Sequence, residues 1–406
     1  MKTTRVSIMR QHQYDVIVVG GGPAGASAAH TLAGHGMKVC LVDKAEFPRD
    51  KLCGGLLTER SRKVFDTVFE TDWQHAVEGV SHGMRFFYHE RLLNEVKDYT
   101  KLTWTRRTRF DAHLVDLAKD AGAHLRQGVA VKTVEPESCT VTLADGIRIS
   151  ADYLIGADGV NSIVAQSLFG RAFDKKTIAF GLEMEAPLDG RLQAITDPEI
   201  YFGVVKWGYG WVFPKRETLT IGVAGLWRKN RDIKSAFERF VEHRCQGLPQ
   251  AKIKGQYIPF GDYRRMPGRD NILLCGDAAG VVESITGEGI AYAMQSGYLA
   301  ARAINEAADR RQPATACRHY AAGYASIAGS LRWANALRYL IFPKWSESLF
   351  VSLLPKTHSV PRKHLDLMAA DLEYNAYVQF LLRKTGGFLF DRMIGRSPDH
   401  RRRALK

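Results

Sequence analysis

The chain has 406 residues, of which 45% are hydrophobic and 25% charged, a balance that is typical of a folded protein and excludes a largely disordered one. The 57 Lys and Arg outnumber the 43 Asp and Glu, which gives a net charge of +14. This surplus favours an anionic partner, or it serves solubility alone.

The cysteine spacing, the N-terminal residues and the hydropathy of the chain exclude several further classes of protein. The six cysteines include no CxxC pair, so no zinc site, iron–sulfur cluster or other metal site is expected. Residues 1–13 lack the apolar core of a signal peptide, and no apolar run reaches the roughly 18 residues that a membrane-spanning helix needs. We therefore expect a cytoplasmic protein that does not cross a membrane. No nucleic-acid-binding pattern accompanies the basic residues, so no nucleic-acid partner is expected.

The first regular elements form a β-α-β unit. Residues 15–19 are a β-branched strand, residues 24–33 an alanine-rich helix and residues 38–42 a second strand. Such a unit begins a doubly wound parallel sheet with helices on its faces. The fold class is therefore expected to be α/β.

The middle of the chain is rich in strands. Alternating apolar residues predict strands over residues 84–88, 92–96, 129–134, 140–143 and 153–155, and a helical period predicts a helix over 110–121. A mostly antiparallel sheet is expected between residues 177 and 259, with strands 178–186, 199–205, 210–213 and 218–225 and one helix, 233–244. The parallel sheet resumes at 272–275 and a long helix begins near Glu288. Beyond Gln312 the chain is expected to be helical, with breaks at Pro343, Pro355 and Pro361.

These elements predict three parts. A discontinuous nucleotide-binding domain, built on the doubly wound parallel sheet, takes residues 14–80, 105–170 and 268–310. An antiparallel-sheet substrate domain is inserted between its pieces, at residues 81–104 and 171–267. A helical C-terminal region takes residues 311–406.

A glycine-rich turn joins the first strand to the first helix. Its spacing is Gly20-x-Gly22-x-x-Gly25, and Asp43 stands at the tip of the second strand. The glycines allow a tight turn and close approach of the backbone to a pyrophosphate, whose charge lies at the helix N-terminus. Asp43 is expected to accept hydrogen bonds from ribose hydroxyls. The turn therefore predicts a dinucleotide site.

Two later turns identify the dinucleotide. Tyr153-Leu-Ile-Gly-Ala-Asp158-Gly159 ends one strand, and Ile272-Leu-Leu-Cys-Gly276-Asp277 ends another before the turn Thr286-Gly287-Glu288-Gly289-Ile290. With these motifs the chain resembles the flavoprotein family that includes the aromatic hydroxylases, flavin halogenases and geranylgeranyl reductases. The resemblance implies FAD as the cofactor, with the Gly–Asp pair at its ribityl and pyrophosphate groups. It also implies that the helix after Gly289 points its N-terminal amides at the flavin ring, where amides stabilise negative charge.

Further segments resemble the geranylgeranyl reductases in particular. Lys51-Leu52-Cys53-Gly54-Gly55 is similar to their Cys-Gly segment beside the flavin, and Arg107-Thr-Arg-Phe-Asp111 is similar to a motif whose Arg reaches the cofactor. Val131 falls where a strand contacts adenine. The cofactor-binding candidates are Gly20, Gly22, Pro23, Ala24, Gly25, Asp43, Lys44, Cys53, Gly54, Gly55, Arg107, Val131, Asp158, Gly159, Gly276, Asp277, Gly287, Gly289 and Ile290.

The segment Tyr209-Gly210-Trp211-Val212-Phe213-Pro214 resembles the YxWxFP core of the substrate cavity in the same reductases. An aromatic strand beside a flavin suits an elongated apolar substrate, although the same residues also suit a buried sheet core. Lys206 stands where the family has proline, and at a cavity rim it would favour an anionic head group. The substrate candidates are Lys206, Tyr209, Trp211, Phe213 and Pro214, and the catalytic candidates are Cys53, Tyr209 and Trp211. Cys53 also suits an inert buried thiol.

The resemblance implies a reductase that hydrogenates isolated C=C bonds of a geranylgeranyl-type isoprenoid lipid or another prenylated substrate. NAD(P)H and ferredoxin are both suitable electron donors. Two alternatives stay open: an FAD-dependent monooxygenase or halogenase on the same fold, and a flavoprotein that carries electrons to a quinone.

The last hundred residues contain no such motif. Aromatic and aliphatic residues there alternate with basic ones: Trp333, Tyr339, Phe342, Trp345, Phe350, Leu353 and Leu354 with Arg332, Arg338 and Lys344, before a terminal Arg401-Arg402-Arg403. Helices of this composition suit peripheral contact with an anionic membrane, here at its inner face. The alternative is that they pack on the sheet domain and carry a solvated tail.

Overall fold

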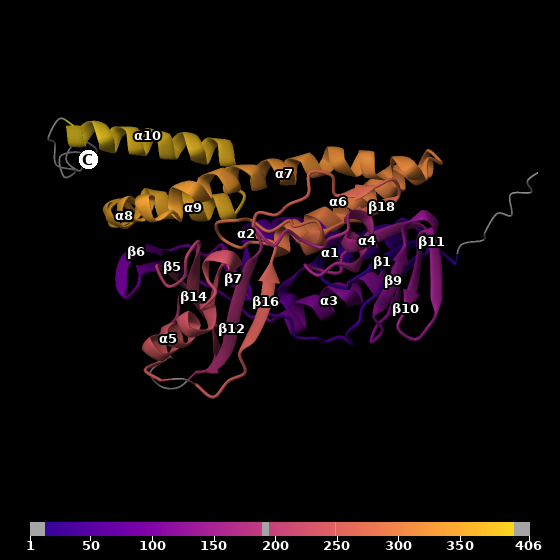
Figure 1. The fold of residues 1–406 in the computed structure, drawn as a ribbon, viewed down its shortest axis with the longest axis horizontal. Helices are drawn as coiled ribbons and strands as arrows, with labels where there is room; N and C mark the ends of the chain where they lie inside the picture. Colours follow the sequence, from indigo (N-terminus) through magenta and orange to yellow (C-terminus); the bar gives the residue numbers. More distant parts are fainter. Residues whose placement is uncertain (1–12, 189–194, 248, 394–406) are drawn as a thin grey trace, which may run out of the picture.

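A computed structural model describes residues 13–188, 195–247 and 249–393. The basic run Arg401–Arg403 lies outside these residues. Strands of the described chain form two large sheets and a small one. The C-terminal helices, coloured orange to yellow in Figure 1, run along one side of the molecule, above both large sheets in that view.

The first large sheet has the order β17-β18-β11-β1-β2-β8, and β10 and β9 continue from β11. Strands β18, β11, β1, β2 and β8 are parallel to one another, whereas β17 pairs antiparallel with β18, and β10 pairs antiparallel with β11 and β9. The bounds are β1 Tyr14–Val19, β2 Val39–Val42, β8 His124–Arg126, β9 Val131–Glu135, β10 Thr140–Leu143, β11 Arg148–Gly156, β17 Gly268–Arg269 and β18 Ile272–Leu274. The near-continuous burial of β1 and β2 fits a sheet covered on both faces.

The second large sheet has the order β16-β12-β15-β14-β13-β5-β6 and is antiparallel except for the pair β13 and β5. Its bounds are β5 Gly83–Tyr88, β6 Arg91–Lys97, β12 Ala179–Pro187, β13 Glu199–Phe202, β14 Gly208–Pro214, β15 Thr218–Leu226 and β16 Lys254–Ile258. The small sheet consists of β3 Leu56–Thr58, β7 Leu102–Trp104 and β4 Gly79–Val80.

Helices cover both large sheets. Their bounds are α1 Pro23–Gly34, α2 Glu59–Phe69, α3 Arg107–Asp120, α4 Ile163–Phe169, α5 Ile233–Cys245, α6 Ile290–Asp309, α7 Ala316–Ile341, α8 Lys344–Leu353, α9 Ser359–Met368 and α10 Tyr374–Met393. Helix α1 is alanine-rich because it is enclosed, with Ala26, Ala28 and Ala29 fully buried. At Gly297 of α6 a Cβ would overlap the Ala24 backbone, so small residues let α1 and α6 pack closely. No helix of the described chain is long and apolar enough to cross a bilayer.

The expected fold class is confirmed: a doubly wound parallel sheet, a separate antiparallel sheet and a helical C-terminal region. Some element bounds differ from the expectation. The strand expected over 199–205 ends at Phe202, because Gly203 takes a φ of +86°. Pro361 lies in the first turn of α9 and not between helices, since a missing N–H costs little at that position. The three domain ranges remain a prediction.

Candidate functional site

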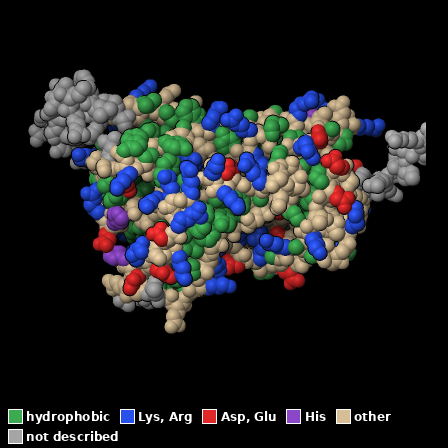
Figure 2. Space-filling model, viewed as in Figure 1, with side chains coloured by type: hydrophobic (Ala, Val, Ile, Leu, Met, Phe, Trp, Pro, Cys, Tyr) green, Lys and Arg blue, Asp and Glu red, His purple; other side chains and the backbone are tan. Residues whose placement is uncertain are grey.

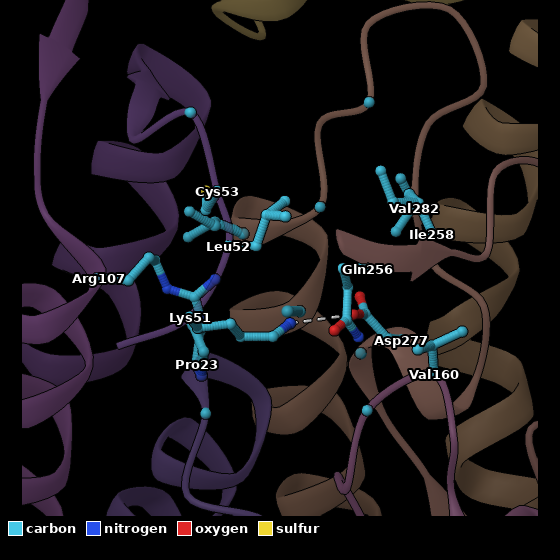
Figure 3. Close-up of a pocket in the computed structure, with 18 of the residues that line it drawn as sticks. Pro23, Lys51, Leu52, Cys53, Arg107, Val160, Gln256, Ile258, Asp277 and Val282 are labelled. Atoms are coloured by element: carbon cyan, nitrogen blue, oxygen red, sulfur yellow. Dashed lines mark hydrogen bonds and ion pairs between the residues drawn. The ribbon is translucent and has the colours of Figure 1, made fainter. Parts of the chain in front are cut away.

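A cavity of about 790 Å³ lies where the two large sheets and α9 meet. Its walls come from segments far apart in the sequence: the turn after β1, the segment 49–56, the start of α3, the turn after β11 and the segment 276–293. The inner face of the second large sheet and α9 complete it. Figure 3 shows how Pro23, Cys53, Arg107 and Asp277 converge on this space.

The glycines of the turn after β1 have two roles: some allow backbone segments to pack closely, and one leaves room for a ligand at the start of α1. Gly20 has a φ of +102°, and a Cβ there would overlap Ala157, whereas a Cβ at Gly25 would overlap the Gly20 carbonyl. At Gly22 the nearest atom to an added Cβ is an Arg49 nitrogen, 3.6 Å away. Gly22 is also the N-cap of α1 and supplies no side-chain cap, so the first amides of α1 face an open cradle. This cradle fits the pyrophosphate of the flavin dinucleotide that the resemblance implies.

Asp43 is held at one end of the cavity. Its Oδ2 accepts a hydrogen bond from the Gly21 N–H at 2.7 Å, and its Oδ1 accepts one from the Ala45 N–H at 2.8 Å. Lys44 and Val131 line the cavity at the same end. The arrangement suits an adenosine group, with a fixed carboxylate beside the ribose.

Arg107 is buried at the start of α3 and forms a two-point ion pair. Its Nε and Nη2 donate to Asp111 at 2.6 and 2.7 Å, and Arg49 Nη1 lies 3.2 Å from the same carboxylate. Both arginines line the cavity. Their charge is therefore shared with Asp111, which fixes both side chains in place.

The carboxylates of Asp158 and Asp277 differ in their hydrogen-bond partners. Asp158 accepts from the Ile163 N–H at 2.7 Å and from the Ser162 hydroxyl at 2.5 Å, so it fixes the start of α4, and burial raises its pKa. Within the described residues, the Asp277 carboxylate has one side-chain partner, Lys51 Nζ at 3.3 Å from across the cavity (Figure 3). Asp158 and Gly159 line the cavity, as do Gly276 and Asp277.

The turn before α6 places a carboxyl group in the cavity wall. Gly287 has a φ of +72°, and α6 starts at Ile290 without a side-chain cap on Gly289. Glu288 accepts from the Thr58 hydroxyl and lies 3.5 Å from Arg60 Nε. Burial raises the pKa of Glu288 to about 7 despite this arginine.

Tyr209, Trp211 and Phe213 of β14 line the opposite wall. The Tyr209 hydroxyl donates to the Thr286 carbonyl, which ties the sheet to the turn before α6. The Trp211 Nε1 is buried and has no hydrogen-bond partner in the described chain. A Cβ at Gly54 would lie 2.7 Å from the Phe213 ring, so the Cys-Gly segment and the aromatic strand are in contact.

Cys53 is bound from behind by the second large sheet. Its N–H donates to Glu183 Oε1 of β12 at 3.1 Å, and its Sγ accepts from the Gly55 N–H at 3.4 Å. Glu183 is buried and its Oε2 has no partner in the described chain. Burial raises the pKa of Glu183 to about 7, with a smaller contribution from the Glu185 carboxylate in the same direction.

Most sequence candidates converge on the cavity, but three do not line it. Gly25 packs behind the turn, and Pro214 is buried at the end of β14. Lys206 is exposed between β13 and β14, and Asn230 holds its backbone N–H at 2.8 Å. Lys206 is therefore not part of the described cavity wall, and its expected role toward an anionic head group stays a prediction.

Sequence inspection missed Glu183 and two cavity-lining residues of α9, His364 and Met368. The signal for Glu183 was a carboxylate, followed two residues later by Glu185, inside a strand whose other residues are apolar. Nothing local in α9 marks His364 or Met368, because their position depends on packing against distant strands. Among the described residues, no cluster of His, Cys, Asp and Glu is arranged to hold a metal ion.

Comparisons with known proteins agree with this geometry. A family model described as an FAD binding domain matches residues 13–196. The chain is 31% identical over 330 residues to digeranylgeranylglycerophospholipid reductase of Thermoplasma acidophilum, covering 72% of this chain and 78% of the relative. It is 29% identical over 323 residues to menaquinone reductase of Mycobacterium tuberculosis, covering 72% of this chain and 76% of the relative. A crystal structure of a geranylgeranyl bacteriochlorophyll reductase-like protein from Thermoplasma acidophilum shares the fold, with a TM-score of 0.67 at 21% identity over 91% of this chain and 98% of that chain.

Proposed function

This chain belongs to the geranylgeranyl reductase family of FAD-dependent oxidoreductases, and we propose that it hydrogenates isolated carbon–carbon double bonds in the prenyl chain of an isoprenoid lipid. The expected cofactor, FAD, and the expected enzyme class, an oxidoreductase, are confirmed by the family match. The relatives are named as reductases of a digeranylgeranylglycerophospholipid and of menaquinone. The substrate of this chain is our proposal.

The observation that carries the proposal is that the glycine cradle and the aromatic strand line one continuous cavity. Gly22 at the N-terminus of α1 and Trp211 of β14 both face it. A cofactor whose pyrophosphate is held at the glycine cradle would therefore present its flavin ring to a substrate held at the aromatic strand. An alkene without activating groups is a poor hydride acceptor, so a dry apolar slot that fixes it beside the ring is the main catalytic device available.

FAD bound here and reduced by an external donor such as NAD(P)H or ferredoxin would supply a hydride to one alkene carbon and become oxidised, while a proton reaches the adjacent carbon and two C–H bonds replace the π bond. The start of α6 directs backbone amides at the site and favours negative charge there. The Cys53 thiol and the Glu288 carboxyl are proton-bearing groups that line the cavity. Tyr209 is a weaker candidate for proton transfer, because burial raises the pKa of its hydroxyl.

The deciding experiment is anaerobic incubation of the chemically reduced enzyme with prenyl lipids, followed by mass spectrometry. We expect products that have gained two hydrogens for each bond reduced. A product that forms only with oxygen and carries an added oxygen or halogen would instead identify the monooxygenase or halogenase alternative. Reduction of a quinone ring with an unchanged prenyl chain would identify the electron carrier.

We further propose that the C-terminal helices contact an anionic membrane at its cytoplasmic face. Trp345 is 71% exposed and Leu340 56% exposed, and Arg332 and Lys344 are exposed nearby in the sequence. Figure 2 shows hydrophobic side chains gathered over α8–α10 with Lys and Arg among them. Arg338 does not belong to this surface, because it is buried and donates to the Phe260 carbonyl at 3.2 Å.

A further inference from the structure

The positively charged side chains of the cavity are committed to carboxylates. Arg49 and Arg107 share Asp111, Lys51 is paired with Asp277, and Lys254 is paired with Asp50. Lys44 makes no ion pair within the described residues, but it is exposed beside Asp43 at the adenosine end. Within the described cavity wall, four cationic side chains are thus held in ion pairs with carboxylates, and the fifth, Lys44, lies at the adenosine end.

The end of the cavity formed by β5, β13 and α9 is apolar. Its lining side chains are Met84, Phe86, Ile200, Phe202 and Met368, with His364 as the one polar member among the described residues. Burial lowers the pKa of His364 to about 4, so its imidazole is neutral near pH 7. The ring is tilted by 49° to the Tyr377 ring, with 5.6 Å between the ring centroids, and no hydrogen bond to its nitrogens is present within the described chain.

Two neutral side chains of the cavity wall therefore carry an N–H group without a hydrogen-bond partner among the described residues. One is Trp211, whose Nε1 is a donor only, has no partner in the described chain and is enclosed beside Gly54, so a ligand reaches it only if the indole shifts. The other is the His364 imidazole, which offers one donor and one acceptor when neutral. A buried donor without a partner is costly, so a bound ligand that supplies an acceptor is favoured.

We infer that the substrate binds through its prenyl chain and an uncharged oxygen-containing head group, and that a diphosphate adds nothing to its affinity. The inference rests on the proposed prenyl reductase function and narrows its substrate class. A neutral carbonyl or hydroxyl oxygen matches the donor that His364 offers in this end of the cavity. A diphosphate beside His364 would be buried against apolar side chains with no counter-ion among the described residues of that end, which is strongly unfavourable.

A matched pair of probes tests this inference. Farnesol and farnesyl diphosphate have the same prenyl chain and differ in the head group, which is an uncharged hydroxyl in one and an anionic diphosphate in the other. Each is titrated into the FAD-loaded full chain, and binding is read from the change in the visible flavin spectrum, without turnover. We expect farnesol to bind as tightly as the diphosphate or more tightly, and a diphosphate that binds more than about tenfold tighter would overturn the inference.

The same titration separates this inference from the proposed function. If the diphosphate binds tightly and its double bonds are reduced anaerobically, the prenyl reductase function stands and the uncharged head group is wrong. If neither probe perturbs the flavin and neither is reduced by FAD-loaded enzyme, the prenyl function itself is overturned.

A variant of His364 tests the donor directly. His364→Phe keeps an aromatic ring but removes the N–H, so we expect affinity for farnesol to fall roughly three- to tenfold, with unchanged affinity for the oxygen-free hydrocarbon farnesene. Lys363→Gln, an exposed residue of the same helix that does not line the cavity, is the control and should change neither affinity. Equal weakening of farnesol and farnesene by His364→Phe would mean that the ring only fills space, and would overturn the donor role.

Discussion

The indole ring of Trp211 lies over Gly222 of the neighbouring strand, where a Cβ atom would overlap its Cζ2 and Cε2 atoms. The two residues are direct partners in the register of β14 and β15. A side chain at position 222 would therefore push the indole out of its place against Gly54, whose added Cβ would lie 3.3 Å from the Trp211 Nε1. The position of the aromatic wall thus depends on a glycine on the next strand.

Gly222→Ala should therefore damage catalysis without removing the cofactor. We expect the turnover of prenyl substrates to fall by about tenfold or more, because a misplacement of about 1 Å can cost that much, while FAD content stays unchanged. Turnover and bound flavin per chain are measured together. Gly329→Ala, where an added Cβ meets nothing within 4 Å, is the control. A parallel loss of FAD and activity would show that Trp211 is part of the structural core alone.

The wild-type protein should be purified yellow, with about one FAD per chain. Gly22→Val should fold but retain no FAD, because the new side chain would point into the open cradle and block the pyrophosphate. Circular dichroism checks the fold, and visible absorbance checks the flavin. Gly34→Ala in the same helix, which also meets nothing within 4 Å, should retain full FAD. Normal flavin content in Gly22→Val would remove the cradle from the site.

Glu183 should make the wild-type protein less stable as the pH rises. Its pKa is raised from 4.5 to about 7 by burial, so the folded state binds its proton more tightly than the unfolded state does. The associated stability is present below pH 4.5 and is lost as the pH rises to about 7. Glu183→Gln does not titrate, so its free energy of unfolding relative to wild type should increase by about 3 kcal/mol between pH 4 and 8. Urea unfolding at both pH values measures this, and a constant difference would contradict it.

Local patterns predicted much of the fold. The β-branched run of β1, the glycine turn and the alanine-rich α1 are adjacent in the sequence, so their periodicity and spacing identify them without tertiary information. Helix α2 was missed, although Thr58 caps it and Phe65 and Phe69 are buried. Its eleven residues, Glu59–Phe69, are largely charged and polar outside that apolar stripe, and the short stripe is a weak signal by itself.

The site residues also fall into two groups: those that local sequence patterns predict and those that depend on tertiary packing. Glycine and aspartate turns could be predicted because their function depends on backbone geometry within a few residues. The hydrogen bond from Cys53 to Glu183 joins residues 130 positions apart, and His364 reaches the cavity only because α9 packs there. Lys206 was placed at a cavity rim by its neighbours in the motif, but the turn at Gly203 and the backbone contact with Asn230 leave it exposed. Spacing within a motif does not fix the direction of a loop outside it.

The last prediction concerns the exposed surface of the C-terminal helices. The enzyme should sediment with anionic vesicles and be released by salt, since each Lys or Arg near an anionic surface contributes roughly 1 kcal/mol. At about 1 M salt the Debye length shrinks to about 3 Å, which should remove the electrostatic share. Replacing both Leu340 and Trp345 by Ser should weaken binding at low salt, because these exposed side chains would enter the interface.

Met266→Ser is the matched control for this double variant. Met266 is 54% exposed but lies in the loop before β17, outside the C-terminal helices, so its loss should leave vesicle binding unchanged. FAD content should be equal in the wild type, the double variant and the control, because none of the changed residues lines the cavity. Equal sedimentation with neutral and anionic vesicles, or with neither, would mean that the aromatic and basic residues of these helices form an ordinary protein surface.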